Sequence, residues 1–564
     1  MGRKILKNKY YLYMTEFFAG MAVMAVELGA SRLLAPYFSS SQIVWTIIIG
    51  TIMIAMAIGN IYGGRSADRN PDPDVLYRRL IIAAIWIAAI PVLGKYVIVL
   101  VAGALVITVS TNFLILAAFI ACMVIFVYPL FLLGTVTPSL VKYTVESLDE
   151  SGTTVGTLGA FNTIGSILGT FLPTFVTIPA VGTAVTFLLF SGVLLVLGLV
   201  YFLSGGTGKR LCAAAAILFI ACSIFGNSDS FAFWEKGLTY EGESIYNYLQ
   251  VKESEDRIVL STNVLFGVQS VKMKSGSLTG MYYDVALAAP LMAGMQPGAE
   301  AGEPAGADAN GAEAAGPAVL ILGNGTGTYA TQCQKYFPGT KVEGVEIDPS
   351  ITELAGEYFS LDPAVEVVTY DGRAYLDEID RKYDVIMVDA YQDITIPFQM
   401  ASKEFFSSVR KHLKDSGVMV VNVNMKTDTE GGINEWLADT IATEFSQVYT
   451  ADVPGWTNRE LFAGNDPAML TNLQGYLRQN GELAEQRQES EAAGQMQEGE
   501  LAEQMQIVAG RLKPYQAGDR ILTDDRAPVE LLSMRAIDKL IADELGHYKK
   551  VFREKGLSGL MEEL

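Results

Sequence analysis

Three glycines in the second half of the chain have the spacing of a nucleotide-binding turn. Residues 319–327 read VLILGNGTG, so Gly323, Gly325 and Gly327 directly follow a run of aliphatic residues. Glycine lets a backbone approach a ligand where a side chain would clash. The pattern is typical of a turn between a strand and a helix that holds a nucleotide. A tight turn needs the same residues, so the glycines alone are weak evidence.

Three acids that end later aliphatic runs make the prediction more specific. Glu346 ends KVEGVE roughly 20 residues after Gly323, where an acid can accept hydrogen bonds from both ribose hydroxyls. Asp371 ends VEVVTYD, where its carboxylate or the neighbouring backbone of Gly372 can contact an adenine edge. Asp389 ends YDVIMVD and is expected to face the middle of the cleft. This set fits an adenosine without a pyrophosphate.

These residues meet only if the runs that precede them form a parallel sheet. From residue 318 onward, short aliphatic runs alternate with amphipathic segments, which predicts a doubly wound, Rossmann-like α/β sheet of the methyltransferase type. Ligands of such sheets bind at the carboxyl ends of the strands. Asp348 is expected to cap a helix that begins at Pro349, and Asp384 to be structural. The expected strands are AVLILG, KVEGVEID, VEVVTYDG, YDVIMVDAY and GVMVVNVN.

Apart from the predicted sheet, composition distinguishes four parts of the chain. Residues 1–228 are strongly apolar, residues 229–292 read as a small β domain, and residues 293–317 are a low-complexity insert. The adenosyl-binding domain is expected over 318–564. An acidic, Gln-rich insert near 479–506 is expected to form a solvated helix or to remain disordered.

The first 228 residues predict a membrane domain of six or seven helices, with a lipid bilayer as partner. About 20 apolar residues cross a bilayer as a helix. Six stretches are long enough, whereas 211–226 is short and is either a span or an interfacial segment. Glu16, Glu27 and Arg32 lie in or beside the first stretch, where ionisable groups are usually paired or functional. The stretches lie near 11–34, 43–62, 80–103, 112–134, 155–178, 182–203 and 211–226.

Positive charges predict the orientation of this domain in the cell membrane. Lysines and arginines precede the first apolar stretch and follow the second, fourth and sixth. The N-terminus and residues 204–210 should therefore be cytoplasmic. If 211–226 crosses, the soluble part lies outside. Because adenosyl cofactors are cytosolic, we expect a cytoplasmic soluble part, which requires that 211–226 does not cross or that 80–134 hides one extra crossing.

Composition also excludes some classes of function. A net charge of −20 argues against a nucleic-acid-binding protein. The four cysteines are scattered without a CxxC pattern, and the chain has only two histidines. No metal site is therefore expected.

Several motifs resemble those of the spermidine synthase family of aminopropyltransferases, and more closely its bacterial members fused to a membrane domain that resembles half a transporter. In the soluble half these motifs are ESIYNYLQV (243–251), GVQ ending at Gln269, YYDVALAAPLM (282–292), GVEID (344–348), VDAYQDITIPFQMASKEFF (388–406) and LTDDRAPVE (522–530). In the membrane half they are APYFSSSQIVW and LLGTVTPSLVK.

The resemblance implies an enzyme of polyamine biosynthesis that moves an aminopropyl group from decarboxylated S-adenosylmethionine to a diamine such as putrescine. It implies dimers or tetramers as well. By this resemblance Glu346 holds the ribose, Asp371 holds the adenine, and Asp389 takes or orients the proton of the amine. The residues implied to line the site around the co-substrate and the amine are Gln269, Tyr282, Tyr391 and Asp393.

Two departures from the family pattern leave other functions open. Thr326 stands where the family has an aspartate implied to bind the aminopropyl ammonium, and Asp389 is separated from Asp393 by one residue more than in the family. A neutral Thr326 tolerates a carboxylate, so an S-adenosylmethionine-dependent methyltransferase is one alternative. A non-catalytic, transporter-like sensor of an adenosyl ligand or a polyamine is the other.

Overall fold

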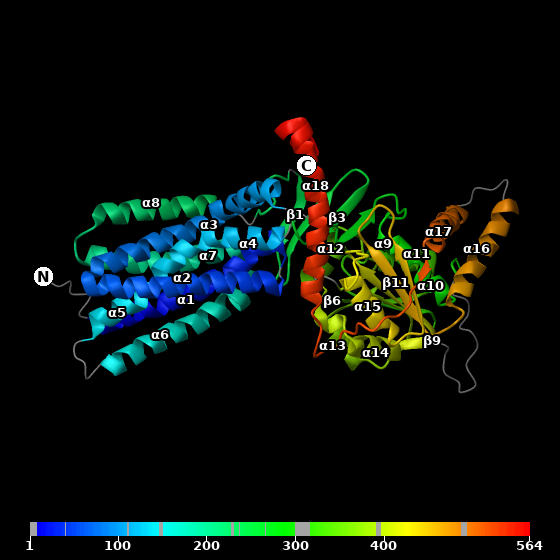
Figure 1. Ribbon diagram of the computed structural model, residues 1–564, viewed down its shortest axis with the longest axis horizontal. Coiled ribbons are helices and arrows are strands. Elements are labelled where there is room, and N and C mark those ends of the chain that lie inside the picture. The colour runs from blue at the N-terminus through cyan, green and yellow to red at the C-terminus, as the bar shows by residue number, and fades with distance from the viewer. Residues whose placement is uncertain are drawn as a thin grey trace.

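The computed structural model describes residues 8–39, 41–109, 112–145, 151–226, 230–235, 237–264, 267–298, 316–390, 396–486 and 493–563. Figure 1 shows a bundle of long helices at one end of the molecule and the strands at the other end. The long helix α18 (Val529–Glu563) runs between these two halves, across the direction of the bundle helices.

The bundle is made of the apolar stretches expected from the sequence. Within the described residues, five helical stretches are long and apolar enough to cross a membrane, namely Lys9–Phe38, Gln42–Arg69, Pro73–Leu105, Phe113–Thr144 and Ser151–Ser204. The last stretch is broken at Gly182, whose φ of 79° and ψ of 171° are not helical. The helices are α1 (Lys9–Phe38), α2 (Gln42–Arg69), α3 (Pro73–Thr108), α4 (Phe113–Gly134), α5 (Val136–Thr144), α6 (Ser151–Leu172), a π-helical turn (Pro173–Thr177), α7 (Ile178–Ser204) and α8 (Lys209–Phe225).

Two of the ionisable residues of the first stretch join separate parts of the molecule. Glu16 is fully buried and accepts hydrogen bonds from Thr137 Oγ1 at 2.5 Å and from Asn162 Nδ2 at 2.8 Å, which links α1 to α5 and α6. Arg32, near the other end of α1, donates to the carbonyl oxygens of Ser244 and Ile245 in the soluble half. Both side chains therefore hold elements together.

The basic loops and the soluble half lie at opposite ends of the bundle. At the end far from the strands, Lys142 Nζ of α5 lies 2.9 Å from Asp68 Oδ1 of α2, and α8 begins nearby at Lys209. At the near end, Lys95 Nζ donates to the carbonyl oxygen of Ser230 at 2.7 Å. Helix α1 therefore begins at the end of the bundle opposite the soluble half.

A four-stranded antiparallel sheet begins the soluble half. Its strands follow chain order and are β1 (Leu238–Glu243), β2 (Tyr248–Glu253), β3 (Arg257–Ser261) and β4 (Ser270–Met273). These strands lie within residues 229–292, which were expected to form a small β domain, although β1, LTYEGE, carries little of the alternation that marks a strand. The short helices α9 (Tyr282–Ala286) and α10 (Ala288–Met292) follow and are completely buried.

The second sheet has eight strands in the order β12-β10-β11-β9-β8-β5-β6-β7. Strands β5 to β9 are parallel, and β10 and β11 form an antiparallel edge on β9. This is the Rossmann-like, methyltransferase-type fold expected from the sequence. Its strands are β5 (Ala318–Leu322), β6 (Lys341–Glu346), β7 (Glu366–Thr369), β8 (Tyr383–Val388), β9 (Leu413–Val423), β10 (Gln447–Asp452), β11 (Arg459–Gly464) and β12 (Lys513–Pro514).

Helices cover both faces of this sheet, and apolar side chains on neighbouring strand positions pack against them. The helices are α11 (Thr328–Tyr336), α12 (Pro349–Glu357), α13 (Gly372–Glu378), a 3-10 turn (Phe398–Met400), α14 (Lys403–Lys411), α15 (Ile433–Ala442), α16 (Met469–Gln486) and α17 (Ala493–Ala509).

The Gln-rich segment differs from the expected solvated helix. In α17, Leu501, Met505 and Val508 are buried, at the spacing of one helix face. Glu500 accepts hydrogen bonds from Leu278 N at 2.8 Å and from Tyr336 Oη at 2.7 Å. Three apolar residues among many polar ones were too few for composition to reveal this packing.

Candidate active site

The glycine turn after β5 needs glycine at each of its three positions. Gly323, Gly325 and Gly327 all have positive φ, at 90°, 52° and 81°. A Cβ atom on Gly323 would lie 2.5 Å from the carbonyl oxygen of Asp389 and 2.6 Å from Ala390 N. The turn is thus packed directly against the end of β8, which brings the loop and Asp389 together.

Glu346, at the end of β6, is held beneath this turn by backbone groups. Its Oε2 accepts from Gly325 N at 2.9 Å and its Oε1 accepts from Asp348 N at 3.1 Å. Burial raises the pKa of Glu346 to about 7, although these two hydrogen bonds act in the opposite direction. A ligand that donates hydroxyl hydrogen bonds to this carboxylate would stabilise its ionised form.

Two other acids of the large sheet, Asp348 and Asp384, have the structural roles expected from the sequence. Asp348 caps α12 by accepting from Ser350 N, and its other oxygen accepts from Ser244 Oγ at 2.5 Å. It thereby joins the small sheet to the large one. Asp384 accepts from Ala318 N and from Lys414 Nζ, so it holds the beginnings of β5, β8 and β9 together.

Asp389, immediately after β8, is buried and oriented by two donors. Its Oδ2 accepts from Tyr282 Oη at 2.7 Å, and its Oδ1 accepts from Asn422 Nδ2 at 2.8 Å. Burial raises the pKa of Asp389 to about 7, the two hydrogen bonds lower it, and the charge of Glu346 raises it. This carboxyl group can therefore exchange a proton near neutral pH, as a general base must.

The residues that follow Tyr282 in its motif form hydrogen bonds that fix the backbone next to the site. Tyr283 Oη donates to the carbonyl oxygen of Gln269 at 2.6 Å, and this fixes the end of the β3–β4 connection. Asp284 accepts from Gly280 N, from Gln332 Nε2 and from the backbone and hydroxyl groups of Thr279. Asp284 therefore stabilises the turn before α9.

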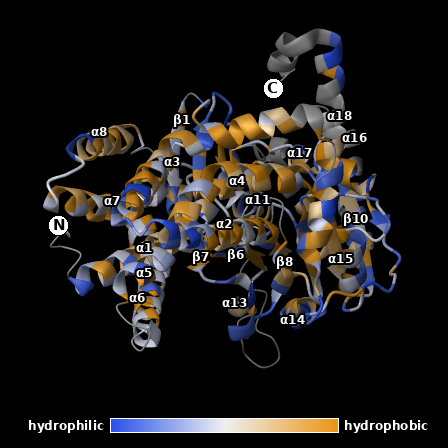
Figure 2. Cartoon of the chain, turned by 60° about the vertical axis from the view of Figure 1, so that its left-hand side comes forward, coloured by the Kyte–Doolittle hydropathy of each residue, from blue (hydrophilic) through white to orange (hydrophobic). Residues whose placement is uncertain are grey.

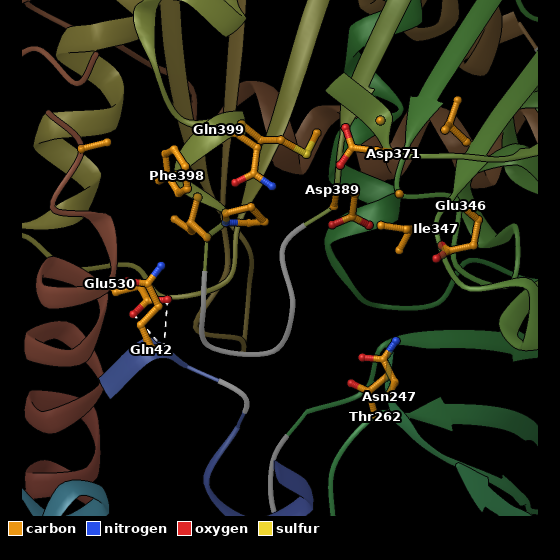
Figure 3. A pocket seen from close by; sticks show the side chains of 18 of the residues that line it. Gln42, Asn247, Thr262, Glu346, Ile347, Asp371, Asp389, Phe398, Gln399 and Glu530 are labelled. Carbon is orange, nitrogen blue, oxygen red and sulfur yellow. Dashed lines mark hydrogen bonds between the residues drawn. The ribbon is translucent and has the colours of Figure 1, made fainter. Parts of the chain in front are cut away.

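A cavity of about 830 Å³ joins most of the residues predicted from the sequence. Gln269, Gly323, Glu346, Asp371, Gly372 and Asp389 line it (Figure 3). Tyr282 is connected to the cavity through the hydrogen bond that it donates to Asp389. Gly325 and Gly327 determine the shape of the glycine turn. Asp371 also caps α13 by accepting from Ala374 N at 2.9 Å. Tyr391 and Asp393, which were also predicted to line the site, lie outside the described residues.

The same cavity has lining residues that sequence reasoning missed. Asn247 directly precedes β2 and Thr262 directly follows β3, while Gln399 comes from the 3-10 turn and Gln42 and Glu530 come from α2 and α18. Asn247 and Glu530 lie in quoted motifs, ESIYNYLQV and LTDDRAPVE, which was the available signal. Gln42 lies in the membrane-half motif APYFSSSQIVW, but nothing in that motif indicated that it would line the cavity.

All charged residues in the described lining of the cavity are acidic. It contains six carboxylates and no lysine, arginine or histidine; the acids are Glu346, Asp371, Asp389, Asp524, Asp525 and Glu530. Arg373 pairs with Asp524, at 2.7 and 2.6 Å. A cavity of this charge and size favours a cationic ligand.

Thr326, the residue that departs from the family pattern, lies within the turn. Its backbone N donates to Ser270 Oγ at 3.1 Å, and its side chain is buried. Among the described residues its hydroxyl has no hydrogen-bond partner. A neutral hydroxyl group thus stands where the resemblance implies a negative charge.

Residues 310–458 match the family model described as Spermine/spermidine synthase domain. A "Probable polyamine aminopropyl transferase" of Bifidobacterium longum is 50% identical over 368 residues, which are 64% of this chain and 77% of that protein. A "Polyamine aminopropyltransferase" of Vibrio vulnificus is 29% identical over 171 residues, 29% of this chain and 54% of that protein. The crystal structure of a probable spermidine synthase from Corynebacterium glutamicum aligns with a TM-score of 0.34 and 19% identity, over 43% of this chain and 88% of that one.

Proposed function

This chain belongs to the polyamine aminopropyltransferase family, and from that premise we propose that it transfers an aminopropyl group from decarboxylated S-adenosylmethionine to a diamine such as putrescine, at a membrane surface. The observation that carries the proposal is a buried carboxyl group with a pKa of about 7, Asp389, in an acidic cavity beside a glycine turn.

The proposed co-substrate fits the strand ends. Glu346 is the proposed acceptor for the ribose hydroxyls, because its carboxylate lies directly beneath the turn at Gly325. Asp371 and Gly372, at the beginning of α13, are proposed to contact the adenine, and Gln269 to line the same end. The remaining acids attract the positive sulfonium and the amine.

The proposed reaction needs a proton acceptor and good alignment. An alkylammonium is not nucleophilic until it loses a proton, which Asp389 is proposed to accept. The nitrogen lone pair then forms a bond to the methylene carbon next to the sulfonium, the carbon–sulfur bond breaks, and its electrons remain on sulfur as a neutral thioether. Because this leaving group needs no acid, alignment in the cavity is expected to contribute much of the rate.

Calorimetry with the detergent-solubilised full chain tests the identity of the co-substrate. We expect decarboxylated S-adenosylmethionine to bind at least tenfold more tightly than S-adenosylmethionine, a difference of about 1.4 kcal/mol. Product analysis with putrescine should then yield spermidine. Equal or reversed preference would favour methyl transfer, for which the neutral Thr326 is the supporting observation. Binding of either without turnover would favour a sensor.

We also propose that the helical half anchors the chain in the cell membrane. Large apolar side chains of α2 face outward, among them Met53, Ile54, Ile58 and Ile61. Figure 2 shows hydrophobic residues along bundle helices such as α4 and α7. Such a surface is stable in lipid and unfavourable in water.

The proposed membrane anchor also predicts on which side of the membrane the soluble half lies. Since the basic loops lie at the opposite end of the bundle, the positive-inside rule puts the soluble half on the outer face, contrary to the expectation from cofactor supply. An impermeant maleimide on intact cells should label Glu357→Cys in α12 and spare Asp68→Cys at the basic end. The reverse pattern would restore the cytoplasmic placement. Outward placement would require delivery of the co-substrate to that face.

A further inference from the structure

The acidic cavity is not closed by the soluble half alone. Gln42, Ile43 and Thr46, all in the first turns of α2, line it together with α18 residues. In the view of Figure 3, Gln42 and Glu530 lie at one side of the cavity, Glu346 lies at the opposite side, and Asp389 lies between. The end of the cavity away from the proposed ribose site therefore belongs to the junction with the helical bundle.

Glu530 is the charged group at this junction. Its Oε2 and Oε1 accept from Gln42 N at 3.0 and 3.2 Å, so one carboxylate spans both halves of the chain. Ser41 already caps α2 through Val44 N, and the helix dipole favours a negative charge at this end. Glu530 is only partly buried and lines the cavity, so its oxygens remain within reach of a ligand.

We propose that Glu530, held by the amino-terminal end of α2, is the residue that makes this enzyme prefer an acceptor with a second ammonium group. The inference rests on the proposed function and deepens it. The amine that reacts lies at Asp389, and the distant ammonium of the same molecule lies at Glu530. The acceptor class is thus a linear diamine or longer polyamine, and the membrane half completes the acceptor site.

Hydrogen bonding and ion pairing favour this residue over three of the other lining acids. Asp524 is already paired with Arg373, and Asp371 caps α13. Glu346 lies with the proposed ribose. Within the described residues both oxygens of Glu530 accept only from Gln42 N, so a cation adds attraction without displacing an ion pair.

Glu530→Gln removes the negative charge but keeps a hydrogen bond at the junction, because the amide oxygen can still accept from Gln42 N. The full chain in detergent is assayed with putrescine and with n-butylamine, which has the same carbon chain and one amine. We expect the KM for putrescine to rise at least tenfold in Glu530→Gln with a smaller change in kcat. The KM for n-butylamine should remain within about twofold.

Glu404→Gln is the matched control. Glu404 also accepts a backbone N–H, from Asp524 at 3.0 Å, and does not line the cavity. Its loss should leave both KM values unchanged. Equal losses for the two amines, or no loss for either, would overturn the inference. Absence of aminopropyl transfer by the wild type would instead overturn the proposed function, and calorimetric binding of the two amines to wild type and Glu530→Gln would then decide the inference by the same comparison.

Discussion

Replacing Asp389 by asparagine should lower kcat by about 10²- to 10⁴-fold, the usual contribution of a general base. An amide cannot take the proton of the acceptor ammonium, yet it can still bond to Tyr282 and Asn422. Binding of the adenosyl co-substrate should therefore change little. Steady-state kinetics with calorimetry on the same preparation measures both quantities, and near-normal kcat in Asp389→Asn would remove Asp389 from the mechanism.

The pH dependence of kcat/KM identifies the group whose ionisation controls the reaction. With a pKa of about 7, Asp389 is mostly protonated below that pH, so kcat/KM should fall about tenfold per pH unit on the acid side. The hydrogen bond from Tyr282 lowers this pKa, so Tyr282→Phe should move the acid limb to higher pH. A limb that stays in place in Tyr282→Phe would mean that another group controls it.

Stability supplies a second test of the same ionisation, with a defined sign. The pKa of Asp389 is raised in the folded chain above the value of about 3.9 for an exposed aspartate. The folded state therefore binds more protons between about pH 4 and pH 7, and its stability falls as pH rises through that window. Asp389→Asn removes this loss, so its thermal midpoint should exceed that of the wild type at pH 8 and approach it at pH 4.

The parallel sheet and the acids at its strand ends could be predicted from sequence for one physical reason. Strands buried on both faces are continuous aliphatic runs, so the residue that ends each run lies at the same edge of the sheet. Glu346, Asp371 and Asp389 were found in this way, and they line one cavity. The antiparallel strands β10 and β11 carry shorter apolar runs and gave a weaker signal.

The junction with the bundle could not be predicted, because its contacts join distant parts of the chain. Gln42 and Glu530 are 488 residues apart, and neither lies in a periodic pattern that implies a partner. The side of the membrane on which the soluble half lies stays a prediction for a related reason. The loop charges left open whether 211–226 crosses, and only the packing of the two halves shows that the basic loops lie at the far end.

Gly323→Ala should damage both the fold of the turn and the binding of the co-substrate. A positive φ costs a residue with a Cβ about 1–2 kcal/mol. The new Cβ would also lie 2.5–2.6 Å from backbone atoms of Asp389 and Ala390, which cannot rotate away as a side chain could. We expect the thermal midpoint to fall and the affinity for decarboxylated S-adenosylmethionine to drop at least about 100-fold, or about 2.7 kcal/mol.

Gly356→Ala is the control that separates this clash from a general effect of adding a methyl group. Gly356 lies in α12 of the same half, is exposed, and a Cβ built there meets no atom within 4 Å. Because alanine favours a helix over glycine by about 1 kcal/mol, this variant should be as stable as the wild type or more stable, with unchanged binding. Wild-type affinity in Gly323→Ala would show that the turn can relax away from β8, and the close packing of Gly323 on Asp389 would then not be what positions the site.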